Sequence, residues 1–314
     1  MPLLSVSVTR DGGLDVAGSL GTALAELPPE APVIAMVHGY KYDPAGAATD
    51  PHRTLFAMES QRRGRRAASW PARLGVGDGA AAEPLAIGFG WGARGSFWRA
   101  WRRSGAAALA LAGLVSSLAA RGRTVHLVGH SLGARVCLRA LALAPEGAIG
   151  RVVLLSGAVP RHEARAALAS PAGRRAEVVN VTSRENDLFD ALTEALTGFA
   201  DRTIGDGLPG APSNWLDLQI DDDATRDGLD RLGYPIGPAS ARVCHWSCYL
   251  RPGVFALYRD LLRDPRRLPL PLLAAHVPSA TQPRWSRMLA RHLPGRGISR
   301  PIRSRARGTA APEG

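Results

Sequence analysis

The chain has 314 residues, 46% of them apolar and 21% charged, which fits a globular protein with one large domain plus additions. Three cysteines make an odd, small count that excludes a disulfide framework, and without further ligands they make a poor zinc site, so we expect no metal and no cofactor. The formal charge is +12, but twelve arginines against three acids follow residue 258, which places the charge in a tail and argues against a nucleic-acid-binding face.

Short apolar runs recur along the chain, separated by glycine-rich turns and by helical patterns. Strands are predicted at 3–9, 32–37, 85–89, 124–128, 152–155 and 177–181, and a late strand at 215–220. Helices are predicted at about 97–120, 134–144, from 188 onward, and at 254–262. The alanine-rich run 105–120 is short for a membrane span and indicates a buried helix. The first residues lack the features of a signal peptide, so we expect a cytoplasmic protein.

This alternation predicts an α/β fold, with a mainly parallel sheet and helices on both faces. In such sheets the ligand lies beyond the carboxyl ends of the strands, so the residues that follow each strand are the candidates for a site. We expect an α/β domain over residues 1–258, in which 188–242 form a lid-like insertion. Residues 259–314 form an Arg/Pro-rich tail that we expect to be partly disordered and dispensable for chemistry. Docking of the apolar side of 283–293 on the domain is the alternative to disorder.

Gly129-His130-Ser131-Leu132-Gly133 matches the pattern G-x-S-x-G. The pattern alone is weak, but here it follows an apolar strand and opens a helix, which is the setting that a nucleophilic serine on a sharp turn requires. Glycine on either side leaves room for the neighbouring strand and helix. A tight turn that happens to contain a serine is the simpler alternative.

The segment VHLVGHSLGARV resembles the nucleophile elbow of the α/β-hydrolase-fold esterases and lipases, and also a group of bacterial α/β-hydrolase-like proteins of unassigned substrate. The resemblance covers roughly residues 30 to 260. It implies an α/β-hydrolase sheet and a triad in the order serine, acid, histidine. Ser131 is the implied nucleophile.

A serine nucleophile needs an imidazole base, and the imidazole needs a group that fixes its tautomer. The implied order favours His245 as the base, because it lies just before the last predicted helix; a histidine packed on Trp246 is the alternative role. His162 is a weaker rival. Asp187 follows the strand at 177–181, where the family commonly carries its acid, although it could equally cap the next helix. The other acids open for this role are Glu185, Asp190 and Asp217.

Two backbone amides must stabilise the oxyanion of an acyl-transfer reaction. The amide of Leu132 is one expected donor, and the amide of Tyr40, in a His-Gly-Tyr loop that resembles the HG-x segment of the fold, is the other. We expect His38, Gly39 and Trp91 to border the substrate. The aromatic residues after the strand at 85–89 could instead belong to the core.

The predicted function is hydrolysis of a small-molecule carboxylic ester through an acyl-enzyme. A peripheral membrane lipase or phospholipase-like enzyme, with the basic tail making weak contact with an anionic membrane, is one alternative. A catalytically silent binding module of the same fold is another. The sequence leaves the substrate and the oligomeric state open.

Overall fold

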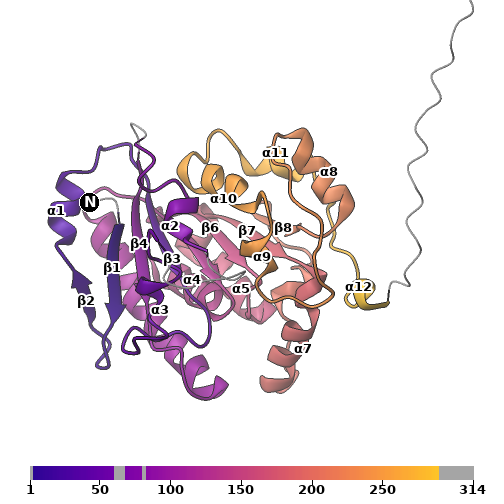
Figure 1. Ribbon diagram of the computed structural model, residues 1–314, viewed down its shortest axis with the longest axis horizontal. Helices are drawn as coiled ribbons and strands as arrows, with labels where there is room; N and C mark the ends of the chain where they lie inside the picture. The colour runs from indigo at the N-terminus through magenta and orange to yellow at the C-terminus, as the bar shows by residue number, and fades with distance from the viewer. Residues whose placement is uncertain (1–2, 60–67, 80–82, 290–314) are drawn as a thin grey trace, which may run out of the picture.

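The computed structural model describes residues 3–59, 68–79 and 83–289 (Figure 1). Its centre is an 8-stranded sheet in the order β2-β1-β4-β3-β5-β6-β7-β8. Every neighbouring pair is parallel except β1 and β2, which form an antiparallel hairpin at one edge. The strands are β1 (Leu3–Val8), β2 (Leu14–Ala17), β3 (Val33–Val37), β4 (Leu85–Gly90), β5 (Val125–His130), β6 (Ile149–Leu155), β7 (Glu177–Thr182) and β8 (Trp215–Gln219). The mixed α/β class predicted from the sequence is confirmed.

Helices cover both faces of this sheet. The longer ones are α3 (Phe97–Ala119), α4 (Leu132–Leu143), α5 (Arg161–Ala169), α7 (Asp187–Leu196), α8 (Asp223–Arg231) and α10 (Val254–Arg263). The shorter ones are α1 (Leu20–Ala25), α2 (Trp70–Arg73), α6 (Pro171–Arg175), α9 (Ser247–Leu250), α11 (Leu270–Ala274) and α12 (Ser286–Leu289), with 3-10 turns η1 (Pro51–Arg53), η2 (Arg184–Asn186) and η3 (Ile204–Asp206). None of the described helices is long and apolar enough to cross a membrane.

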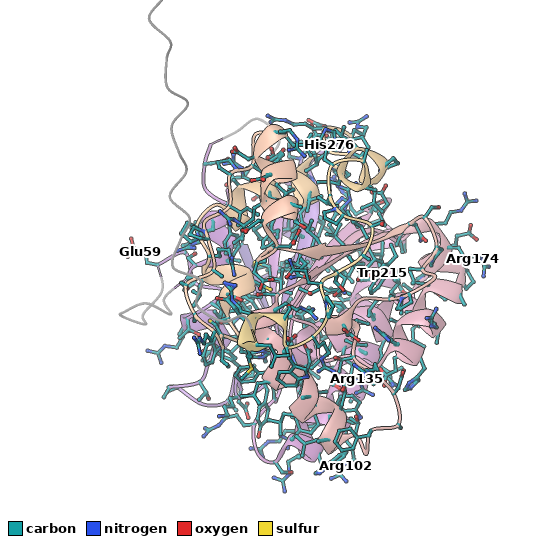
Figure 2. The ribbon with its side chains drawn as sticks, turned by 90° about the vertical axis from the view of Figure 1, so that its right-hand side faces the viewer. Glu59, Arg102, Arg135, Arg174, Trp215 and His276 are labelled. Carbon is teal, nitrogen blue, oxygen red and sulfur yellow. The ribbon has the colours of Figure 1, made fainter. Side chains whose placement is uncertain are left out.

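The period of two along each strand divides the core into two layers. In β3, Val33, Ala35 and Val37 pack on the side of α3 and α4, whereas Ile34 and Met36 pack on the side of α10. Figure 2 shows this layering from the side, with Trp215 of β8 between the layer that carries His276 and the layer that carries Arg135. Because both faces are covered, the central strands read as continuous apolar runs rather than as alternating ones.

Part of the insertion expected at 188–242 belongs to the sheet. It includes β8, which pairs in parallel with β7 from Val178 opposite Trp215 to Thr182 opposite Gln219. The chain from α7 through η3 to β8 is therefore a crossover connection between two neighbouring strands. Its loss of helical periodicity reflects the turns of this crossover.

Part of the expected tail docks on the domain, which was the alternative to disorder. Residues 265–289, here called the C-terminal segment, pack on the domain. Arg284 forms a buried ion pair with Glu194 at 2.8 Å, and the Trp285 amide donates to the Asp187 carboxylate at 2.6 Å. Four of its apolar side chains belong to the buried core on the α10 side: Leu268, Leu270, Leu273 and Val277. The remaining tail residues, 290–314, which carry six of the arginines, lie outside the described residues.

Truncation after Pro265 should therefore destabilise the fold rather than leave it intact. Each buried aliphatic side chain contributes about 1.5–3 kcal/mol, so the loss of four is on the order of 6 kcal/mol or more. That is comparable to the whole stability of a typical domain, about 5–15 kcal/mol. Thermal unfolding of the truncated chain should show a large drop in Tm or no cooperative transition. Truncation after Leu289 is the control, because it keeps every contact described above. A Tm within a few degrees of that of the full chain after truncation at Pro265 would contradict this packing.

Candidate active site

Ser131 lies at the junction between β5 and α4, at the carboxyl edge of the sheet. Its φ of 55° and ψ of −120° are a strained combination for a residue with a Cβ. The surrounding backbone holds it there: its N–H donates to the Leu155 carbonyl at 3.0 Å, and its carbonyl accepts from Ala134 at 3.1 Å and Ala158 at 3.2 Å. The strand–turn–helix setting that the sequence predicts is thus the setting that the structure has.

Two glycines let other backbone segments approach this turn closely. A Cβ on Gly133 would collide with the carbonyl oxygens of Val37 and His38 at the end of β3. A Cβ on Gly39 would lie 2.8 Å from both the Ser131 Cβ and the His130 carbonyl oxygen. The loop after β3 therefore lies directly against the serine, as a loop that supplies an oxyanion donor must.

His38 and Trp91 bind each other and hold this loop. The His38 imidazole accepts from the Trp91 amide through Nε2 at 3.0 Å, and the Trp91 indole donates to the His38 carbonyl at 3.1 Å. Their rings stack with centroids 5.6 Å apart, and burial lowers the pKa of His38 to about 3. The two side chains are 0% and 1% exposed, and their expected contact with a substrate stays a prediction. Gly39, the third residue expected to border the substrate, lies beside Ser131.

The two predicted oxyanion donors flank Ser131. Leu132 is the first residue of α4, so its amide is one of those at a helix N-terminus that have no partner within the helix. Tyr40 follows Gly39, and its hydroxyl donates to the carbonyl of Gly95, in the loop between β4 and α3, at 2.5 Å. The amide roles of both residues stay predictions.

His245 is brought to the elbow by His130, the residue before the serine. The His130 Nε2–H donates to the His245 carbonyl at 3.0 Å, and the two ring centroids are 4.6 Å apart. On its other side the His245 ring stacks on Phe189 of α7, with centroids 4.5 Å apart. The sequence placed His245 near the elbow, but the contacts through His130 and Phe189 were not predicted.

The His245 imidazole is neutral and its tautomer is defined. Burial lowers the pKa of His245 well below its usual value, and the nearby His130 lowers it further. Its Nδ1 lies 2.6 Å from the Oδ1 of Asn186, which can only accept, so Nδ1 carries the hydrogen and Nε2 is left as the basic nitrogen. A general base for a serine hydroxyl needs this tautomer.

No protein-family model matches this chain. A search of curated proteins also finds no match. The site therefore has to be interpreted from its own geometry.

The structure places Asn186, not Asp187, against His245. Asp187 turns the other way: its Oδ2 accepts from the Trp285 amide at 2.6 Å, and its Oδ1 lies 3.4 Å from an Arg184 guanidinium nitrogen. Burial raises the pKa of Asp187, while Arg184 opposes the rise. The predicted acid thus anchors the C-terminal segment, a contact 98 residues away in sequence that no local pattern reveals.

Two of the other candidate acids have structural partners. Glu185 is buried, forms an ion pair with Arg251, and accepts from the Ala241 amide at 3.0 Å. Its carbonyl accepts from the Cys244 amide at 2.8 Å, so it fixes the loop that carries His245. Asp217 on β8 accepts from Asn180 and from the Trp215 indole, at 2.7 and 2.9 Å.

The third acid, Asp190, lies one helical turn beyond Asn186 on α7 and is 2% exposed. The rival base His162 is far more open than His245, with its side chain 67% exposed and paired with Asp201. Sequence reasoning weighed only carboxylates for the orienting role and so missed Asn186. The adjacent pair Asn186-Asp187 at the start of a helix was the signal that could have made Asn186 a candidate.

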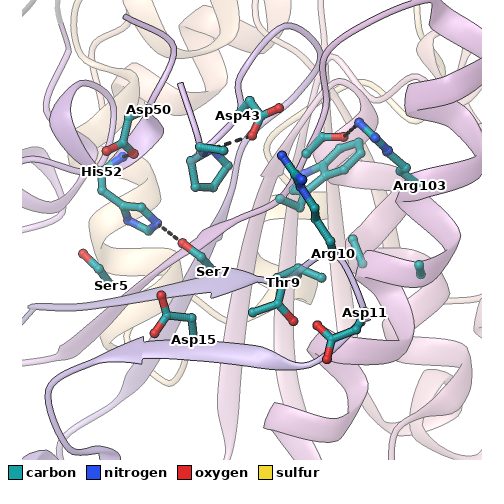
Figure 3. A pocket seen from close by; sticks show the side chains of 18 of the residues that line it. Ser5, Ser7, Thr9, Arg10, Asp11, Asp15, Asp43, Asp50, His52 and Arg103 are labelled. Atoms are coloured by element: carbon teal, nitrogen blue, oxygen red, sulfur yellow. Dashed lines mark hydrogen bonds between the residues drawn. The ribbon is translucent and has the colours of Figure 1, made fainter. Parts of the chain in front are cut away.

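A pocket of about 1040 Å³ opens near the β1–β2 hairpin at one edge of the sheet (Figure 3). Hydroxyl, carboxylate and arginine side chains line it, and within it the Ser7 hydroxyl lies 3.0 Å from His52 Nε2. Trp91 borders this pocket, whereas Ser131 and His245 are not part of its lining. No group of three or more His, Cys, Asp or Glu side chains suited to a metal ion occurs in the described part of the chain.

Proposed function

We propose that this chain is a serine hydrolase that cleaves carboxylic esters through an acyl-enzyme on Ser131. The observation that carries the proposal is the strained backbone of Ser131 between a strand and a helix, with the loop of Gly39 packed against its Cβ. A tight turn with no chemical role would need neither the strain nor the close approach of a second loop. The arrangement agrees with the α/β-hydrolase resemblance of the sequence.

In the proposed reaction the Ser131 hydroxyl attacks the ester carbonyl carbon while His245 Nε2 takes its proton. The tetrahedral oxyanion accepts hydrogen bonds from the amides of Leu132 and Tyr40. Collapse of this intermediate breaks the bond to the alcohol, which leaves with the proton held by His245. A water molecule, deprotonated by the same Nε2, then attacks the carbonyl carbon of the acyl-enzyme. Collapse of this second intermediate breaks the bond to Ser131 Oγ, which takes the proton back from His245 as the carboxylic acid leaves.

Asn186 takes the place that a carboxylate holds in most such sites. Replacing the acid of a triad by an amide commonly costs about 10⁴-fold in rate, largely because the amide stabilises the wrong imidazole tautomer. Here Oδ1 faces Nδ1–H, so the tautomer is the productive one. The amide carries no charge to stabilise the imidazolium, and this is the observation that favours the catalytically silent module as a second candidate.

Apolar side chains exposed near the site favour a lipid-like ester as the substrate of the proposed hydrolase. Leu188 and Leu192, one turn apart on α7, are 49% and 54% exposed, and Leu188 follows directly after Asp187. Met288 and Leu289 of α12 are exposed as well, and α12 follows Trp285, whose amide binds Asp187. An ester with a long acyl chain would cover such surface.

A panel of p-nitrophenyl esters of increasing acyl length tests the proposal. We expect the purified full-length protein to hydrolyse at least the short esters well above the spontaneous rate, and a fluorophosphonate to inhibit that activity. A rise in kcat/KM with acyl length would favour the lipid-like substrate. Absence of turnover across the panel, together with no inhibition, would instead favour the silent module.

A further inference from the structure

The pocket at the β1–β2 hairpin is separate from the candidate active site. Two strands, β4 and β3, lie between β1 and β5, the strand that leads to Ser131. The pocket volume of about 1040 Å³ is comparable to that of small-molecule sites, which is roughly 300–1,000 Å³. The reaction proposed above makes no use of this space.

One face of the hairpin forms the base of the pocket. Ser7 stands opposite Asp15 and Ser5 opposite Ala17, and residues that are opposite each other in an antiparallel pair point to the same face. All four line the pocket, whereas the alternate residues of β1 enter the core (Figure 3). Because these side chains are short, they leave a hollow in front of the sheet with hydroxyl and carboxylate groups at its base.

His52 of η1 lines the pocket and contacts this base. Its Nε2 lies 3.0 Å from the Ser7 hydroxyl oxygen, and Gly90 makes room for the ring, since a Cβ there would lie 2.7 Å from Nε2. Burial lowers the pKa of His52, which favours the neutral ring. Its Nδ1 is buried and has no hydrogen-bond partner in the described part of the chain.

The unpaired Nδ1 indicates which nitrogen of His52 carries the hydrogen. A buried N–H without an acceptor is rarer than a buried acceptor without a donor, so we place the hydrogen on Nε2. Nε2 then donates to the Ser7 oxygen, and the hydroxyl hydrogen of Ser7 is left to donate to a ligand.

Charged groups of both signs surround this base. Arg10 and Asp15 are exposed, and within the described residues their side chains form no hydrogen bond or ion pair. Asp43 and Asp50 each accept from a backbone amide, at 3.0 and 2.9 Å. The charged side chains of the lining are four carboxylates and two guanidinium groups: Asp11, Asp15, Asp43, Asp50, Arg10 and Arg103.

We propose that this pocket binds a neutral polyhydroxylated molecule of the size of a monosaccharide. A ligand hydroxyl both donates and accepts, so it can donate to Asp15 and accept from Arg10 or from Ser7. An anionic ligand would meet four carboxylates, and a cationic one would meet two guanidinium groups, so both are disfavoured relative to a neutral one. The proposal does not depend on ester hydrolysis.

Binding of glucose, galactose and myo-inositol to the full-length protein tests the proposal. Saturation-transfer difference NMR should show that at least one of them binds, with a Kd of about 1 mM or below, which a ligand of about twelve heavy atoms reaches at ordinary efficiency. In ¹⁵N spectra the same ligand should shift the backbone amides of Ser5, Ser7 and Asp15, and leave that of Leu132 at the elbow unchanged.

Two variants locate the site by its side chains. Asp15→Asn and Arg10→Ala should each raise the Kd about tenfold, as loss of a hydrogen bond to a charged group commonly does. Both residues are exposed, so the Tm should stay within a few degrees of that of the wild type. Asp227→Asn is the matched control, because it removes an exposed carboxylate from α8, and it should leave the Kd unchanged.

No binding of any of the three molecules would overturn the proposal. Binding that both variants leave unchanged, or that shifts Leu132 in place of Ser7, would overturn it as well, since the ligand would then occupy another place. Tighter binding of glucose 6-phosphate than of glucose would contradict the preference for a neutral ligand. None of these measurements needs turnover, so an unreactive Ser131 would count against the proposed function and not against this pocket.

Discussion

Ser131→Ala should reduce ester turnover by about 10⁴-fold or more, because removal of the nucleophile of a triad leaves only the oxyanion donors and substrate binding. The substitution removes one oxygen from a residue whose backbone is held by Leu155, Ala134 and Ala158, so those hydrogen bonds stay in place. Steady-state kcat on the best p-nitrophenyl ester measures the loss.

Ser116→Ala is a matched control for that experiment. Its hydroxyl donates to the Ala112 carbonyl within α3, away from the elbow, and its loss should change kcat by less than about twofold. Turnover in Ser131→Ala that stayed within tenfold of wild type would mean that the activity belongs to another residue.

His245→Ala should be nearly as damaging, again by about 10⁴-fold in kcat, because the serine hydroxyl then has no base. The matched control is His162→Ala, which removes an exposed imidazole bonded to Asp201 and should leave kcat unchanged. Together the two variants separate the half-buried histidine beside the elbow from the exposed one. Equal losses in both would show that neither acts as a specific base, and a loss in His162→Ala alone would reassign the role.

The central strands and the elbow could be predicted because their signals are local. The runs that became β3, β4 and β5 are buried on both faces, and a continuous apolar run ending in glycine is a strong pattern. The position of Ser131 could be predicted for the same reason, because it directly follows the strand β5. By contrast β2 (Leu14–Ala17) and α1 were missed, because both are short and mostly exposed and carry little hydrophobic periodicity.

The orienting residue could not be predicted because a distant segment decides it. Asp187 and Asn186 are neighbours at the start of α7, and either could meet His245. The Trp285 amide donates to the carboxylate of Asp187, and the Oδ1 of Asn186 lies against the imidazole. The first of these contacts depends on a segment that composition alone marked as a disordered tail.

The composition of the C-terminal segment also led to the expectation that it is disordered. Arginine and proline are typical of poorly ordered tails. Here Arg284 is buried against Glu194, and the leucines between the prolines enter the core. Part of the positive charge of that segment is therefore paired within the domain. The number of arginines is for this reason a weaker argument for contact with an anionic membrane.

Labelling by a fluorophosphonate probe tests the nucleophile most directly. The wild-type protein should gain the mass of one probe, the labelled peptide should contain the adduct on Ser131, and Ser131→Ala should gain none. A single adduct at Ser131 that depends on His245 is the result predicted by the proposed acyl-enzyme chemistry. No adduct on the folded wild-type protein, or an adduct that persists in Ser131→Ala, would contradict it.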